Sequence, residues 1–292
     1  MNRFFFILSL IFVPLAAGQV ELRATLETTY NAWRESMIRR DPSAWQRVTA
    51  ENRRVEVRNR IISEKKAFPA AVFDLPAPPP SLVGLKFLEA NRRGATAKAA
   101  YFGKIDFSVG GAPTENLLVL SFIKGNAGWL YDRADFVNLE GLNAVRKELA
   151  AGNLKYLKET PEAQPSGEVP PTPIAANPAK YVAKVYVFCP GREVRTQINK
   201  ISSHRFTNAK EAEIVIGGAV DGVNEVQYTT KKLQGATGKE ALTVRVYLMS
   251  QVEGVKPIKA FEYQVAEGAA VKPFGSGSFL VDTAVVKALS GK

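Results

Sequence analysis

The sequence predicts two domains of different class, an α+β domain followed by an all-β antiparallel sandwich. The chain has 292 residues, enough for two hydrophobic cores of ordinary size. Residues 159–178 contain six prolines and almost no long apolar side chains, which predicts an extended linker. Apolar residues recur at helical and then strand spacing before this stretch, and at strand spacing after it. The predicted domains are therefore residues 19–158 and 179–292.

The first eighteen residues predict a signal peptide. Arg3 precedes the apolar run Phe4–Val13, and the small residues Ala16 and Gly18 follow it. We expect cleavage near Gly18, with cleavage after Ala17 or an uncleaved anchor as the alternatives. The run is short for a membrane span, so the sequence predicts an exported protein, periplasmic or secreted, without stable membrane insertion.

Helical patterns open the first predicted domain. Val20–Arg39 is expected to be a helix because five apolar residues recur three or four positions apart. They are Leu22, Leu26, Tyr30, Trp33 and Met37. Asp41 is expected to cap a second helix, with Pro42 at its first position. Thr49 is expected to begin a third helix that ends near Ala67.

Four strands and a last helix are expected next. Leu117–Lys124 is apolar on both faces, which is typical of a central strand. Turn residues separate the four strands, so they predict an antiparallel meander. The expected elements are strands at Leu82–Glu89, Ala97–Phe107, Leu117–Lys124 and Trp129–Val137, and a helix at Gly141–Tyr156.

Residues Val20–Leu139 resemble the nuclear transport factor 2-like superfamily. The resemblance rests on the aromatic first helix, the Asp41–Pro42 start of the second, and the hairpin sequence Gly125-Asn126-Ala127-Gly128-Trp129. It implies helices packed on a curved, cone-like sheet that encloses an apolar pocket. It does not imply one activity, since the superfamily includes isomerases, dehydratases, hydrolases and non-catalytic binding modules.

Short strands dominate the second predicted domain. Six or seven of them, separated by Gly, Asn, Pro and Lys clusters, predict the antiparallel sandwich. The expected strands are Tyr181–Cys189, Glu193–Ile201, Ala212–Gly217, Glu225–Lys231, Leu242–Met249, Lys259–Val265 and Ser278–Val286.

The sequence contains few residues whose type and spacing indicate a metal site or a catalytic site. His204 is the only histidine and Cys189 the only cysteine, so no metal site of the His/Cys type is expected. We interpret His204 as a solvated loop residue and Cys189 as a half-buried strand residue. No cofactor is expected. The net charge of +11 favours acidic partners, but we expect no nucleic acid because the chain is predicted to be exported.

Four aromatic residues are the predicted ligand-binding residues. Tyr30 and Trp33 share one face of the first helix, and Trp129 and Tyr131 alternate onto one side of a strand. They are expected to line an apolar pocket, with a filled core as the alternative.

The functional prediction is an exported, non-catalytic binding or interaction protein. It would hold a small apolar ligand or an envelope protein and would dock through the sandwich, with a homodimer through the first domain. The alternative is an isomerase, dehydratase or hydrolase that uses the same pocket. Its candidate acids and bases are Tyr30, Tyr101, Tyr131 and Asp132.

Overall fold

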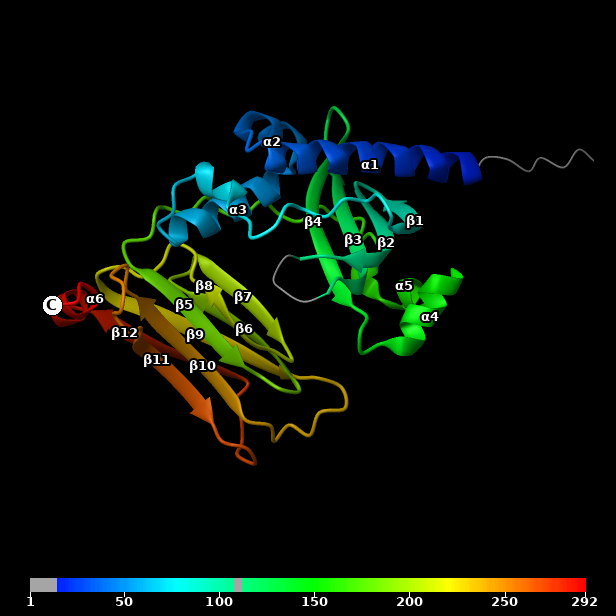
Figure 1. The fold of residues 1–292 in the computed structure, drawn as a ribbon. Helices are drawn as coiled ribbons and strands as arrows, with labels where there is room; N and C mark the ends of the chain where they lie inside the picture. The colour runs from blue at the N-terminus through cyan, green and yellow to red at the C-terminus, as the bar shows by residue number, and fades with distance from the viewer. Residues whose placement is uncertain (1–14, 108–111) are drawn as a thin grey trace, which may run out of the picture. The chain divides into compact units, whose positions relative to one another are not determined.

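A computed structural model describes residues 15–107 and 112–292 (Figure 1). Most of the predicted signal peptide lies outside these residues, so its presence and its cleavage near Gly18 stay predictions. The chain divides into two compact units. The first comprises residues 1–54 and 73–171, and the second comprises residues 55–72 and 172–292. Within the described ranges, no helix is long and apolar enough to span a bilayer.

The predicted fold class is wrong. The described chain is mostly β, with twelve strands in three antiparallel sheets, six α-helices and no closed sheet. An α+β cone would need one sheet curled around a pocket, with helices on its concave side. The sheet of the first unit instead has apolar side chains on both faces, and separate helical segments cover each face. Periodicity identified the elements but not the side of the sheet on which each would pack.

The first unit begins with α1 (Leu15–Ile38) and α2 (Pro42–Val48). The predicted cap of α2 is confirmed. Asp41 Oδ1 accepts hydrogen bonds from the backbone amides of Ser43 and Ala44, at 2.9 and 3.0 Å. Helix α3 (Glu51–Ser63) starts in this unit, but from Val55 onward it belongs to the second unit.

A four-stranded meander forms the rest of the first unit. It consists of β1 (Lys86–Arg93), β2 (Thr96–Ile105), β3 (Thr114–Lys124) and β4 (Trp129–Asn138), paired in that order. Helix α1 lies against one face of the sheet (Figure 1). The opposite face packs against three short helices. They are α4 (Asn143–Ala151), α5 (Lys155–Glu159) and the 3-10 helix η2 (Pro161–Ala163).

Two four-stranded antiparallel sheets form the second unit, and apolar side chains from both make its single core. One sheet has the order β11-β10-β5-β8 and the other β12-β9-β6-β7. The strands are β5 (Val182–Phe188), β6 (Arg192–Ile198), β7 (Ser202–Thr207), β8 (Lys210–Ile214), β9 (Gly222–Lys232), β10 (Leu242–Met249), β11 (Ile258–Val265) and β12 (Phe274–Val281). The short helices η1 (Ala70–Phe73) and α6 (Thr283–Leu289) complete the described elements.

The proline-rich segment, residues 159–178, is more ordered than a free spacer. Its first half returns to the sheet of the first unit, where Gln164 Nε2 donates to Glu89 Oε1 at 3.1 Å. Its second half is held within the second unit by Asn59 of α3. That side chain donates to the carbonyl of Ile174 at 2.8 Å and accepts from the amide of Ala176 at 2.9 Å. Each proline lacks a backbone N–H group, so this segment forms few backbone–backbone hydrogen bonds. Side chains such as Asn59 supply partners for its other backbone groups.

Candidate functional site

The aromatic residues predicted to bind ligand lie mainly in the core between α1 and the sheet. Tyr30 is 0% exposed, and its hydroxyl donates to the carbonyl of Pro80 at 2.8 Å. The rings of Trp33 and Tyr131 stack with their centroids 3.9 Å apart, and the Tyr30 ring centroid lies 5.7 Å from that of Trp33. This packing matches the filled core that was the alternative to an open pocket.

Trp129 lies at the start of β4 and is half-buried. Its carbonyl accepts a hydrogen bond from Thr29 Oγ1 at 3.3 Å, and Lys124 Nζ lies 5.3 Å from its ring centroid. Tyr101 also lies in this core, where its hydroxyl donates to Glu27 Oε1 at 3.0 Å. Burial raises the pKa values of Tyr30, Tyr101 and Tyr131 above that of a free tyrosine. None of the three is thereby prepared to act as a base at neutral pH.

The opposite face of the same sheet carries a groove of about 410 Å³, which we call the sheet groove. Strands β2, β3 and β4 form one side of it and the proline-rich segment the other. Its lining residues are Thr96, Ala97, Lys98, Ser121, Phe122, Ile123, Asp132, Arg133, Asp135, Pro161, Glu162, Gln164, Pro165, Ser166, Glu168 and Pro170. The volume lies in the range of small-molecule sites.

A row of three polar residues crosses the floor of the sheet groove. Lys98 on β2 is the register partner of Ser121 on β3, and Ser121 is the partner of Arg133 on β4. Paired residues of an antiparallel sheet project to the same face, so these side chains share one side of the sheet. Farther along the same strands, that side is apolar and covered by helices.

A β-bulge brings a carboxylate beside this row. The register of β3 with β4 shifts between Ser121 and Phe122, which leaves Asp132 as the extra residue. Asp132 is 4% exposed. Its Oδ1 accepts from Asn52 Nδ2 at 2.9 Å, and its Oδ2 accepts from Arg133 Nε at 3.1 Å. Asp132, the extra residue of the bulge, and its neighbour Arg133 both line the groove.

The Ser121 hydroxyl is the exception in this polar arrangement. Ser121 is 8% exposed, and its Oγ has no hydrogen-bond partner among the described residues. A buried hydroxyl without a partner has lost its bonds to bulk water and has gained none from the protein, which is unfavourable. Ser121 lines the groove, so rotation of its side chain toward the groove would let a bound polar group supply the partner.

The sheet groove is lined by more acidic than basic side chains. Four carboxylates line it, from Asp132, Asp135, Glu162 and Glu168, against the two cationic groups of Lys98 and Arg133. Burial lowers the pKa of the Lys98 ammonium, an effect that nearby Asp135 opposes and Arg133 reinforces. The Lys98 ammonium also donates a hydrogen bond to the carbonyl of Glu162. The groove therefore holds a local excess of negative charge within a chain whose net charge is +11.

Two glycines allow the proline-rich segment to approach the sheet closely. Gly94, with φ of +52°, lies in the β1–β2 turn, and a Cβ there would lie 2.9 Å from the carbonyl oxygen of Gly167. The amide of Gly167 donates to Thr96 Oγ1 at 2.8 Å. This contact anchors one wall of the sheet groove.

Sequence reasoning identified only part of this site. Asp132 was a candidate acid, but it lies on the other face of the sheet from the tyrosines proposed to act with it. Ser121 and Lys98 were not singled out. Ser121 had a usable signal, because it is the only polar residue between Leu117 and Ile123 in a strand expected to be central. A lone hydroxyl in such a run requires either a partner or a site.

The only histidine and the only cysteine have structural environments in the second unit. His204 Nε2 lies 2.6 Å from Ser202 Oγ, which also accepts from the amide of Ile216 at 2.8 Å. Burial and, to a smaller extent, the nearby positive charge of Arg60 together lower the pKa of His204 to about 4. His204 is therefore a partly buried strand residue and not the solvated loop residue expected. Ser202 is 0% exposed, so this pair does not present a nucleophile to solvent. Cys189 is fully buried, where a half-buried residue was expected.

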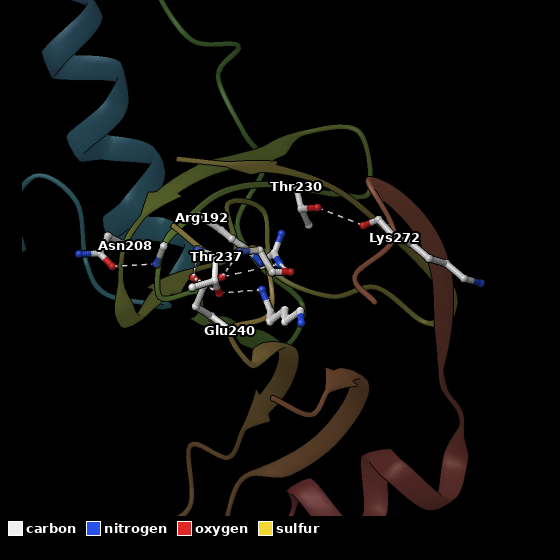
Figure 2. A network of polar contacts seen from close by, with 9 residues as sticks. Arg192, Asn208, Thr230, Thr237, Glu240 and Lys272 are labelled. Carbon is white, nitrogen blue, oxygen red and sulfur yellow. Dashed lines mark hydrogen bonds and ion pairs between the residues drawn. The ribbon is translucent and has the colours of Figure 1, made fainter. Parts of the chain in front are cut away.

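A second polar cluster lies within the second unit (Figure 2). Glu240 accepts hydrogen bonds from the amide and hydroxyl of Thr237, at 2.7 and 2.8 Å, and from the amide of Gly238 at 2.9 Å. Hydrogen bonds from its own backbone amide and from Thr237 lower the pKa of Glu240 to about 2. Arg192 donates to the carbonyl of Gly238. These bonds fix a loop, and in the part of the chain that the structure describes no group of three or more His, Cys, Asp or Glu side chains is placed to hold a metal ion.

Comparisons with known proteins add no assignment. The chain matches no family model, no curated protein and no solved structure. The resemblance to the nuclear transport factor 2-like superfamily therefore stays a prediction, and the candidate site rests on the geometry of the sheet groove alone.

Proposed function

We propose that this protein is a non-catalytic binding protein whose ligand enters the sheet groove and carries a cationic group. The observation that carries the proposal is the Ser121 hydroxyl, buried without a protein partner among residues that line a groove. The site differs from the apolar pocket predicted from the sequence. Six charged side chains line it, and its floor lies on the opposite face of the sheet from the aromatic core.

Charge favours a cation over an anion. An approaching ammonium or guanidinium meets the carboxylates of Asp135, Glu162 and Glu168, whereas Asp132 is already held by Asn52 and Arg133. A planar guanidinium suits such a site because its several N–H groups can bond to carboxylate and hydroxyl oxygens together. Pro161, Pro165 and Pro170 supply apolar wall for a short aliphatic stem.

A matched pair of small probes tests the proposal. Butylguanidinium and butylurea have nearly the same shape, but only the first is charged. We expect butylguanidinium to bind the full chain and to shift amide NMR signals of β2, β3 and β4, with butylurea at least tenfold weaker. Equal binding of the two probes, or shifts confined to other strands, would refute a cation site in the sheet groove.

Variants of lining residues separate the site from general surface charge. Asp135→Asn and Ser121→Ala should each weaken butylguanidinium binding severalfold, because each removes an oxygen from a residue that lines the groove. Glu140→Gln removes an exposed carboxylate that does not line the groove, so it serves as the control and should bind like the wild type. Unchanged affinity in the two groove variants would contradict the proposal.

A hydrolase at the same groove is the second candidate, favoured by the lowered pKa of Lys98 and its cross-strand pairing with Ser121. A neutral Lys98 amine would accept the Ser121 proton as the hydroxyl attacks an ester carbonyl, and it would return that proton to the leaving alcohol. Water would then hydrolyse the acyl-serine. Covalent labelling of Ser121 by a fluorophosphonate, lost in Lys98→Met, would support this candidate. No labelling would leave the binding function as the proposal.

A further inference from the structure

The exposed face of the sheet β12-β9-β6-β7 carries a second groove, of about 510 Å³, within the second unit. Six of its lining residues lie at the outward-facing positions of β6, β7 and β9, and all but the half-buried Gln197 are exposed. They are Arg195, Gln197, Ser203, Arg205, Gln227 and Thr229, and we call them the donor face. We propose that the donor face binds a linear acidic polysaccharide, one whose sugars carry carboxylate groups.

Strand register arranges these side chains in two rows. Gln227, Gln197 and Ser203 are successive register partners across β9, β6 and β7, and Thr229, Arg195 and Arg205 form the next row. Neighbouring strands lie about 4.8 Å apart, so each row presents polar groups at a regular spacing across the sheet. A regular row suits an extended polymer better than a compact ligand.

The charge of the donor face specifies an anion. None of the residues that line the groove is acidic. The adjacent carboxylate of Glu193 is shared between the two arginines, with Oε1 2.8 Å from Arg195 Nε and Oε2 2.7 Å from Arg205 Nη2. Those bonds and a further one from Arg205 Nε take one N–H of Arg195 and two of Arg205, of about five on each guanidinium. The remaining N–H groups and the net positive charge complement a carboxylate.

The uncharged side chains favour a sugar over an acidic peptide. Amides and hydroxyls both donate and accept hydrogen bonds, as the hydroxyl groups of a sugar do. The second row continues onto β12, where Phe274 is the register partner of Thr229 and is 71% exposed. An exposed ring at the end of a polar row offers an apolar surface on which the C–H face of a sugar ring can rest.

Binding measurements with three probes test the proposal on the full chain. The probes are an oligogalacturonate of eight sugars, the same oligosaccharide with its carboxylates methyl-esterified, and a peptide of eight glutamates. We expect the oligogalacturonate to bind at least tenfold more tightly than either of the others. Equal binding of the peptide would overturn the sugar assignment, equal binding of the ester would overturn the role of charge, and no binding of the oligogalacturonate at millimolar concentration would overturn the proposal.

Variants locate the site. Arg195→Gln with Arg205→Gln should weaken oligogalacturonate binding at least tenfold. Gln197→Ala with Gln227→Ala, which leaves the charge unchanged, should weaken it severalfold. The control removes two positive charges from the other sheet, through Lys184→Gln with Lys210→Gln, and should bind within twofold of the wild type. Circular dichroism confirms that each variant is folded. A control that loses as much affinity as the arginine variant, or a glutamine variant that loses none, would contradict a specific donor face.

Discussion

The two faces of the β1-β2-β3-β4 sheet are built from the same four strands but end in different states. The face toward α1 is filled by rings, with Tyr30 fully buried and Trp33 stacked on Tyr131. The opposite face is covered by short helices over part of its length, and it opens into the sheet groove where Lys98 and Ser121 replace apolar residues. On this sheet, the groove lies where the helices no longer cover the face and polar side chains replace apolar ones.

The contrast also concerns how polar groups are satisfied. On the closed face the Tyr30 hydroxyl has a backbone acceptor, so its burial leaves no polar atom unpaired. On the open face the Ser121 hydroxyl has no partner among the described residues. A buried polar group with a hydrogen-bond partner is compatible with a stable fold. A buried polar group without one lowers stability, and such groups are found at functional sites.

The largest expected effect tests whether the aromatic face is a filled core. Tyr30→Ala should lower the free energy of unfolding by about 3–5 kcal/mol, because it removes a fully buried ring. Tyr30→Phe is the matched control. It removes only the hydrogen bond to Pro80 and should cost about 1 kcal/mol. Urea unfolding measures both, and a loss below 1 kcal/mol in Tyr30→Ala would indicate an open pocket instead.

A pH effect in the second unit extends the comparison to a partly buried polar group with a partner, His204. The pKa of His204 is about 4 in the folded protein, below the value of 6.5 for free histidine. The unfolded chain therefore binds a proton between these pH values that the folded chain does not. The contribution of neutral His204 is complete above pH 6.5 and is lost as the pH falls toward 4, by up to about 3 kcal/mol.

The difference between wild type and a His204→Gln variant isolates this effect, since carboxyl groups titrate in both. We expect the stability difference between them to shrink from pH 7 to pH 4 and to become constant below that. An NMR titration of this only histidine gives its pKa directly. A folded-state pKa near 6.5 would remove the predicted pH dependence.

A smaller loss is expected at the edge of the sheet groove. Asn52→Ala removes the hydrogen bond from Asn52 to the buried Asp132 carboxylate and should cost about 1–3 kcal/mol. Asn52→Asp is expected to be worse, because it places a second carboxylate against the first. If Asn52→Ala were neutral, Asp132 would be adequately solvated, and the bulge would not be the anchored feature described above.

The smallest expected effect is the most specific to the open face. Ser121→Ala should not lower the free energy of unfolding and should raise it by up to about 1 kcal/mol, because the hydroxyl that it removes is buried without a protein partner. Ser202→Ala is the comparison at a buried serine with partners, and should cost about 1–3 kcal/mol. Equal losses in the two variants would mean that Ser121 is satisfied and the sheet groove has no polar floor.

Local features of the structure followed from the sequence. Asp41 and Pro42 specify a helix start by themselves, since a cap needs only neighbouring residues. Leu117–Lys124 was expected as a central strand, and β3 lies between β2 and β4. All seven residues of β6 alternate between buried and more exposed positions without interruption. These patterns have periods of two to four residues, so a short window of sequence contains all the information that they need.

The site was decided by tertiary structure. No local pattern marks Asp132 as a bulge residue, because a bulge is a mismatch between two strands and not a property of one. The sequence likewise does not show which face of the sheet α1 covers, or that Asn59 supplies hydrogen bonds to the proline-rich segment. The sheet groove exists because three strands and the proline-rich segment meet at Lys98 and Ser121, and such meetings depend on packing energies summed over residues far apart in the chain.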